Sequence, residues 1–152
     1  MRTSMIPVAL AALLAACGGD PDAPGRCGAG AAEATLAFGD PPGAEARTTL
    51  ILGPQGGCHV AVGVWLAGAW ADRVTLSGAV TLDDGAVLEA RRRLRVTDEG
   101  GRCLAGPFPV VAFEPEAAVG PGRAVFQVED ELGNQVDAEA PLTLEPNPAC
   151  QR

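Results

Sequence analysis

Apolar and polar residues alternate with a period of two over most of the chain after residue 32. The clearest stretch is 58–66, and one of its faces is formed by Cys58, Val60, Val62, Val64 and Leu66. Because side chains two residues apart on a strand lie on the same face, this pattern predicts a core strand. No segment shows the sustained 3.6-residue period with caps that would predict a helix.

The same alternation predicts a series of short strands separated by turns. The expected strands lie at 36–38, 48–52, 58–66, 74–82, 87–96, 108–113, 124–128 and 136–144. The turn sequences 83–85 (Asp-Asp-Gly) and 130–134 each predict a hairpin, and Pro109 indicates an edge because proline cannot donate a ladder hydrogen bond. This pattern predicts an all-β fold, an antiparallel immunoglobulin-like β-sandwich of about seven or eight strands. The predicted domain covers residues 33–152.

The N-terminus has the pattern of a bacterial lipoprotein signal. Residues 1–16 contain Arg2 and an apolar run that is shorter than the about 20 residues needed to span a bilayer. The sequence Leu14-Ala15-Ala16-Cys17 resembles the lipobox, in which the cysteine accepts lipid before cleavage. Ordinary signal cleavage fits less well because Leu14 would occupy a position that prefers a small residue. We therefore expect Cys17 to be lipidated.

Lipidation would anchor the protein to a membrane, because several acyl chains on one residue bind far more stably than one. Residues 17–32 are rich in Gly, Pro and Asp and predict a flexible tether between lipid and domain. The first acidic residue after the cysteine is Asp20. In the lipoproteins that the sequence resembles, an aspartate directly after the cysteine retains the product in the inner membrane. We therefore expect a location in the cell envelope, at the outer membrane.

Composition narrows the classes of partner. The chain has 152 residues, 47% of them apolar, with 20 Gly and 13 Pro, which suits one turn-rich domain. Its formal net charge of -8 opposes binding to nucleic acid or to an anionic membrane surface. Envelope proteins or glycans are the partners that remain, besides the membrane reached through the lipid.

The cysteines left after Cys17 predict two disulfides. They are Cys27, Cys58, Cys103 and Cys150, an even number in an exported chain. If the first three strands alternate in direction, Cys27 pairs with Cys58 and Cys103 with Cys150, although three connectivities are open. A zinc site is disfavoured because these cysteines lack the close spacing of metal ligands.

Residues able to support catalysis are few. The chain contains one His, His59, and the expected mature chain one Ser, Ser77, both within predicted strands. Neither lies in a strained turn of the kind that exposes a nucleophile, so we expect no enzyme activity. An accessory subunit of an envelope hydrolase is the weakest alternative function.

Metal and phosphate sites are weakly indicated. Carboxylates at 83–84, 98–99 and 129–131 favour a calcium-dependent adhesion domain as an alternative, although none has the spacing of an EF-hand. No metal site and no cofactor are predicted. The arginine run 91–95 resembles a phosphate-binding row, but on a strand it is more typical of a solvated edge that deters strand pairing.

The loop 53–57 (Gly-Pro-Gln-Gly-Gly) carries the most specific resemblance. It lacks the Lys-Ser/Thr of a phosphate-binding loop. The sequence Leu-Gly-Pro-Gln-Gly-Gly-Cys-His-Val at 52–60 resembles a motif in uncharacterised lipoproteins of GC-rich, myxobacterial-type Gram-negative bacteria. The stretch 128–134 is similar to the V-x-D-x-x-G turn of bacterial immunoglobulin-like domains. The resemblance implies a sandwich and an envelope location, and no activity.

The expected function is therefore a non-catalytic binding or structural module. The candidate binding surface combines the residues of the glycine-rich loop with the two tryptophans: Gln55, His59, Trp65 and Trp70.

Overall fold

The computed structural model describes residues 26–151 and is all-β, as the alternation predicts. Its elements are β1 (Glu33–Phe38), β2 (Arg47–Thr49), β3 (Ile51–Leu52), β4 (Cys58–Ala67), β5 (Arg73–Leu82), β6 (Val87–Glu99), β7 (Arg102–Ala112), β8 (Gly120–Asp130), β9 (Gln135–Glu145) and the 3-10 helix η1 (Pro148–Cys150). Across residues 26–151, no helix has the length and apolar character needed to cross a membrane.

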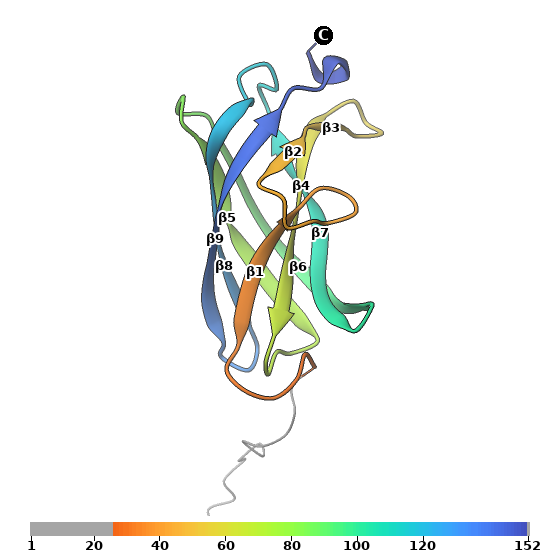
Figure 1. Ribbon diagram of the computed structural model, residues 1–152, viewed down its shortest axis with the longest axis vertical. Helices are drawn as coiled ribbons and strands as arrows, with labels where there is room; N and C mark the ends of the chain where they lie inside the picture. The colour runs from red at the N-terminus through yellow and green to blue at the C-terminus, as the bar shows by residue number, and fades with distance from the viewer. Residues whose placement is uncertain (1–25, 152) are drawn as a thin grey trace, which may run out of the picture.

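The strands form one sheet that is nearly closed as a barrel (Figure 1). Their order is β1-β4-β7-β6-β5-β8-β9-β2, and β3 pairs with β4 off this path. Paired strands are antiparallel except β2 and β9, which are parallel. The structure thus differs from the expected seven or eight strands in two antiparallel sheets: the sheet formed by residues 26–151 is mixed and has nine strands.

One seam of the barrel lies between β6 and β7. Residues 87–95 of β6 pair with β5, and only residues 96–99 pair with β7, at 102–105. Beyond this short ladder, β4 is the only partner of β7 among residues 26–151, and Pro109 stands opposite Ala61 of β4. Pro109 therefore lies at an open edge, as its missing N–H predicts.

The segment 47–52 closes the opposite seam. Its first part pairs with β9 as β2, and its second part pairs with β4 as β3. Between them Leu50 is buried, and its N–H donates to the carbonyl oxygen of Glu145 at 3.3 Å. One continuous segment thereby joins the two walls.

Apolar side chains from alternate positions fill the barrel. The predicted inward row of β4 is buried throughout: Cys58, Val60, Val62, Val64 and Leu66. Phe108 of β7 and Phe126 of β8 meet edge to face with their ring centroids 6.1 Å apart. Since β7 and β8 are not neighbours in the sheet, this contact ties the walls together across the core.

Two disulfides fasten opposite ends of the barrel. Cys27 is bonded to Cys103 and Cys58 to Cys150, with Cα–Cα distances of 5.6 and 5.9 Å. All four predicted cysteines are therefore bridged. The expected pairing of Cys27 with Cys58 and of Cys103 with Cys150 is wrong.

The error lies in the direction of the second predicted strand. Both β1 and β3 run antiparallel to β4, so the chain continues in the direction of β1 through β2 and β3 instead of reversing. Cys27 forms a β-bridge with Gly68, just beyond the last residue of β4. Cys58 is the first residue of β4. The two cysteines are therefore separated by the length of that strand.

The barrel has two ends, the entry end and the far end. The entry end carries Cys27 and the β4–β5, β6–β7 and β8–β9 connections, at the bottom of Figure 1. The far end carries η1, the β5–β6 turn and the β7–β8 loop, at the top.

The start of the described chain is attached to the entry end. The N–H of Arg26 donates to the carbonyl oxygen of Trp70 at 2.9 Å, next to the bridge between Cys27 and Gly68. Arg26 and Cys27, two residues of the expected tether 17–32, are therefore held against the barrel. The expected signal peptide and Cys17 lie outside the described residues.

Candidate functional site

The structure does not bring the four residues of the candidate binding surface together. Gln55 is exposed in the turn between β3 and β4 at the far end, and His59 is two residues into β4. Trp65 is half-buried near the other end of β4, against Thr35 of β1. The predicted surface thus separates into two regions.

Trp70 does not belong to a surface, which corrects the predicted binding surface. Its side chain is 1% exposed and belongs to the core. The indole N–H donates to the carbonyl oxygens of Glu33 at 3.1 Å and Ala67 at 2.9 Å. Trp70 is therefore a core residue at the entry end, and its N–H is satisfied inside the protein.

The glycine-rich loop 53–57 is a tight turn that leads into β4. The N–H of Gly53 donates to the carbonyl oxygen of Gly57 at 2.8 Å, and that of Gly56 to Gly53 at 3.0 Å. Gly56 has a φ of 82°, which favours glycine. The His59 ring lies against this turn, since a Cβ added at Gly53 would be 3.5 Å from its Nδ1. The loop therefore has a structural role, with His59 beside it.

His59 and Ser77 are not arranged as a catalytic pair. His59 is on β4 and Ser77 on β5, and these strands are not neighbours in the sheet. Both residues alternate with buried residues of the core, so their side chains point away from the barrel on different walls. A nucleophile and its base must lie within hydrogen-bond reach.

A hollow of about 340 Å³ lies beside the entry-end disulfide. Trp65 lines it, and the guanidinium of Arg102 stacks over the Trp65 ring at 4.1 Å from the ring centroid. The carboxylates of Glu33 and Asp98 also line this hollow. It therefore has mixed charge, and one face of the Trp65 ring is covered by Arg102.

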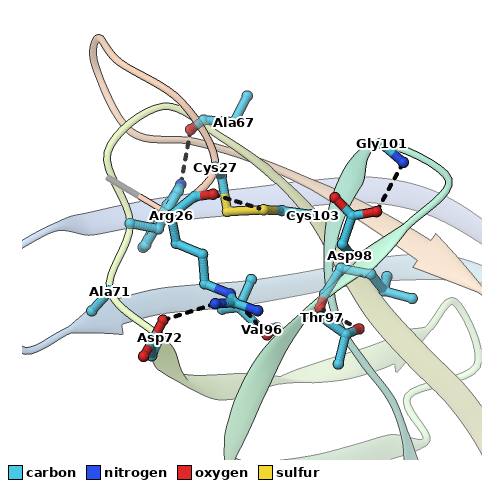
Figure 2. The surroundings of a disulfide bond; sticks show 12 residues. Arg26, Cys27, Ala67, Ala71, Asp72, Val96, Thr97, Asp98, Gly101 and Cys103 are labelled. Atoms are coloured by element: carbon cyan, nitrogen blue, oxygen red, sulfur yellow. Dashed lines mark hydrogen bonds and ion pairs between the residues drawn. A yellow bond between two sulfur atoms is a disulfide. The ribbon is translucent and has the colours of Figure 1, made fainter. Parts of the chain in front are cut away.

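Arg26 crosses the entry end beside the same disulfide (Figure 2). Its Nε donates to the carbonyl oxygen of Val96 at 3.1 Å, and its Nη1 is 3.1 Å from Oδ1 of Asp72. Asp98 is also engaged, since its Oδ1 accepts from the N–H of Gly101 at 2.9 Å. These charged groups mainly hold the connections of the entry end in place.

The aspartates that suggested calcium bind backbone amides in turns. Asp84 accepts from the N–H of Ala86 at 3.0 Å. Asp130 accepts from the N–H groups of Ala71 at 2.9 Å and Leu132 at 3.0 Å, and from Asn134. Within residues 26–151, no three His, Cys, Asp or Glu side chains gather where they could hold a metal ion. These contacts are those of turn-forming aspartates.

The arginine row of β6 is engaged on the outer face of the barrel. Arg91 pairs with Glu129 at 3.3 Å and Arg93 with Glu131 at 3.7 Å, across the intervening strand β5. The row flanks the part of β6 that, in the described part of the chain, has no strand partner on the side of β7. This placement agrees with an exposed edge protected by charge.

Sequence reasoning missed an apolar region at the far end. Phe113 is 91% exposed and Val87 is 52% exposed, and both line a hollow of about 170 Å³ between the β5–β6 turn and the β7–β8 loop. The sequence predicts a strand that ends at Phe113, because alternation alone does not show that the chain has left the sheet at this residue. An unbroken apolar run at 110–113 is the one signal in the sequence.

Comparison of the chain with protein-family models, curated proteins and solved structures found no match.

Proposed function

We propose that this protein is a lipid-anchored lipoprotein of the cell envelope, at the outer membrane, that acts as a non-catalytic binding or structural module. The observation that carries the proposal is the pair of disulfides, one at each end of the barrel. Disulfides persist in oxidising compartments outside the cytoplasm. They support the export that the sequence of residues 1–16 predicts.

The geometry of the entry end supports anchoring through Cys17. The described chain enters the barrel at Arg26, nine residues after Cys17, and Cys27 is covalently fixed to Cys103. A lipid on Cys17 would therefore hold the entry end toward the membrane and leave the far end pointing away. Kinship with immunoglobulin-like domains is part of the same proposal and is supported by the all-β fold.

A binding role fits the surface better than catalysis. The far end has exposed apolar side chains beside a hollow, whereas His59 and Ser77 lie on different walls. The calcium-dependent and hydrolase-accessory alternatives gain no specific support from residues 26–151.

Fractionation of a Gram-negative host expressing the full chain tests the anchor. Cys17→Ser should move the protein from the membrane pellet to the soluble fraction, because the variant cannot accept lipid. Gly18→Asp is the matched control: it should stay in the membrane pellet but shift from outer to inner membrane. Retention of Cys17→Ser in the pellet would contradict the anchoring proposal.

A further inference from the structure

The far-end tip is an apolar surface formed by two short connections. It consists of the β5–β6 turn, residues 83–86, with Val87 at the start of β6, and the β7–β8 loop, residues 113–119. Phe113 and Val87 are its most exposed apolar side chains, and between them a hollow of about 170 Å³ is lined mainly by alanines and Leu88. A cavity of about 150 Å³ holds a benzene molecule, so this hollow has room for one large side chain.

The tip is held in place by its own hydrogen bonds. In the β5–β6 turn, the N–H of Leu82 donates to the carbonyl oxygen of Ala86 at 2.8 Å. In the β7–β8 loop, the N–H groups of Ala117 and Ala118 donate to the carbonyl oxygen of Glu114 at 3.0 and 3.1 Å. Ala118 is also buried. A preformed hollow binds with a smaller loss of conformational entropy than one that must be ordered.

The rim of the tip is acidic. The two connections carry four exposed carboxylates, of which Glu114 also lines the hollow: Asp83, Asp84, Glu114 and Glu116. The two connections contain no basic residue, and within residues 26–151 none of the four carboxylates forms an ion pair with an arginine. Elsewhere on the barrel, glutamates such as Glu129 and Glu139 are paired across strands.

We propose that the far-end tip binds a cationic protein segment that inserts one aliphatic or aromatic side chain between Val87 and Phe113 while flanking Lys or Arg residues face the acidic rim. Charge complementarity selects this occupant. A second copy docked tip to tip would bring identical carboxylates, and its chain also has a net charge of -8; an anionic lipid surface would be repelled in the same way.

This inference rests on the proposed function in one respect: an anchor at Cys17 would direct the tip away from the membrane, toward soluble or opposing proteins. The binding chemistry itself does not depend on the anchor. Failure of the peptide experiment below would leave the fractionation result standing, and the two proposals are therefore separable.

The experiment uses three labelled nine-residue peptides and the full chain purified in detergent. The first peptide has a central Leu flanked by two Arg on each side, the second has Glu in place of Arg, and the third has Ser in place of Leu. Fluorescence anisotropy should show that the first peptide binds at least about tenfold more tightly than the others. Its affinity should fall with added salt because the flanking charges are solvent-exposed.

Two pairs of variants locate the site. Phe113→Ser should weaken binding of the first peptide by about fivefold or more, whereas Leu132→Ser should not change it. Leu132 is 63% exposed in another acidic turn, but it does not line the far-end hollow. Glu114→Gln should weaken binding about two- to fivefold, and Glu99→Gln, at the entry end, should leave it unchanged. All four substituted residues are exposed, so circular dichroism should show the folded barrel in each variant.

Four results would overturn the proposal. The first two are that none of the three peptides binds, or that the acidic peptide binds as tightly as the first. The third is that Phe113→Ser and Leu132→Ser lower the affinity for the first peptide equally. The fourth is that Phe113→Ser abolishes binding of a different occupant, either a second copy, seen as a concentration-dependent dimer in ultracentrifugation, or phosphatidylglycerol vesicles.

Discussion

Trp65 and Trp70 lie five residues apart but belong to different environments. Trp65 is half-buried on the outer face under Arg102, whereas Trp70 is 1% exposed and donates its N–H to two carbonyl oxygens. Trp70→Ala should lower the free energy of unfolding by about 3–5 kcal/mol, because it opens a cavity and removes both hydrogen bonds of the indole N–H. Urea unfolding followed by circular dichroism measures the change.

The outer tryptophan supplies the control for this prediction. Trp65→Ala removes a cation–π contact worth about 0.5–1 kcal/mol and leaves the barrel interior intact, so its effect should be much smaller. Trp70→Phe distinguishes the contribution of the aromatic ring from that of the hydrogen bonds, since it keeps an aromatic side chain but lacks the N–H. Equal destabilisation by the two alanine variants would contradict the assignment of Trp70 to the core.

At the level of elements, β5 is held between β6 and β8 by an uninterrupted ladder on each side. At Gly78 a Cβ would meet the backbone of Val125 and Phe126 on β8. Gly78→Ala should therefore destabilise the protein by about 1–3 kcal/mol through overpacking, despite alanine's lower conformational entropy when unfolded.

A second glycine distinguishes crowding from a general effect of adding a methyl group. Gly57 lies in the β3–β4 turn, and an added Cβ there would meet no atom within 4 Å. Gly57→Ala should change the urea midpoint little, or raise it slightly. A loss for Gly57→Ala as large as that for Gly78→Ala would show that the close approach of β8 is not the cause.

Strand positions could be predicted from the sequence because alternation is a local signal. The stretches 58–66 and 74–82 correspond closely to β4 and β5, and the turn at 83–85 joins β5 to β6 as predicted. The direction of 48–52 could not be predicted, because the same residues would alternate whether the chain reversed or continued after β1. The wrong disulfide pairing followed from that single ambiguity.

The candidate site was less predictable than the strands. The glycine-rich sequence predicts the turn that holds Gln55 beside His59, but Trp70, which is part of the expected binding surface, is 1% exposed. The alternation predicts a strand through Phe113, whereas β7 ends at Ala112 and Phe113 is 91% exposed. Exposure at such positions depends on where strands end relative to their partners, which is a tertiary property.

Over the whole molecule, the disulfides give each end of the barrel its own fastening. Cys27–Cys103 ties the first described residues to the start of β7, and Cys58–Cys150 ties the start of β4 to η1. The loops that they close span 76 and 92 residues, so the chain-entropy model gives similar stabilisation for both, about 4–5 kcal/mol at most. The two disulfides should therefore stabilise different ends of the barrel by similar free energies.

Hydrogen exchange on paired variants tests this division. In Cys27→Ser with Cys103→Ser, amides near Arg26 and Gly68 should exchange faster, because their β-bridge loses its covalent support. Amides of the far end should exchange no faster than the loss of global stability alone explains. In Cys58→Ser with Cys150→Ser the pattern should reverse, with faster exchange in η1 and the β3–β4 turn.

The two variants should also differ in peptide binding at the far-end tip. Loss of Cys27–Cys103 leaves the β5–β6 turn and the β7–β8 loop in place, so the affinity for the cationic peptide should be kept at temperatures where the variant is folded. Loss of Cys58–Cys150 should weaken the affinity for this peptide, because it loosens the end of the barrel that carries the tip. At that end β4 pairs with β7 up to Ala112, next to Phe113. A weaker affinity in the first variant than in the second would contradict the independence of the two ends.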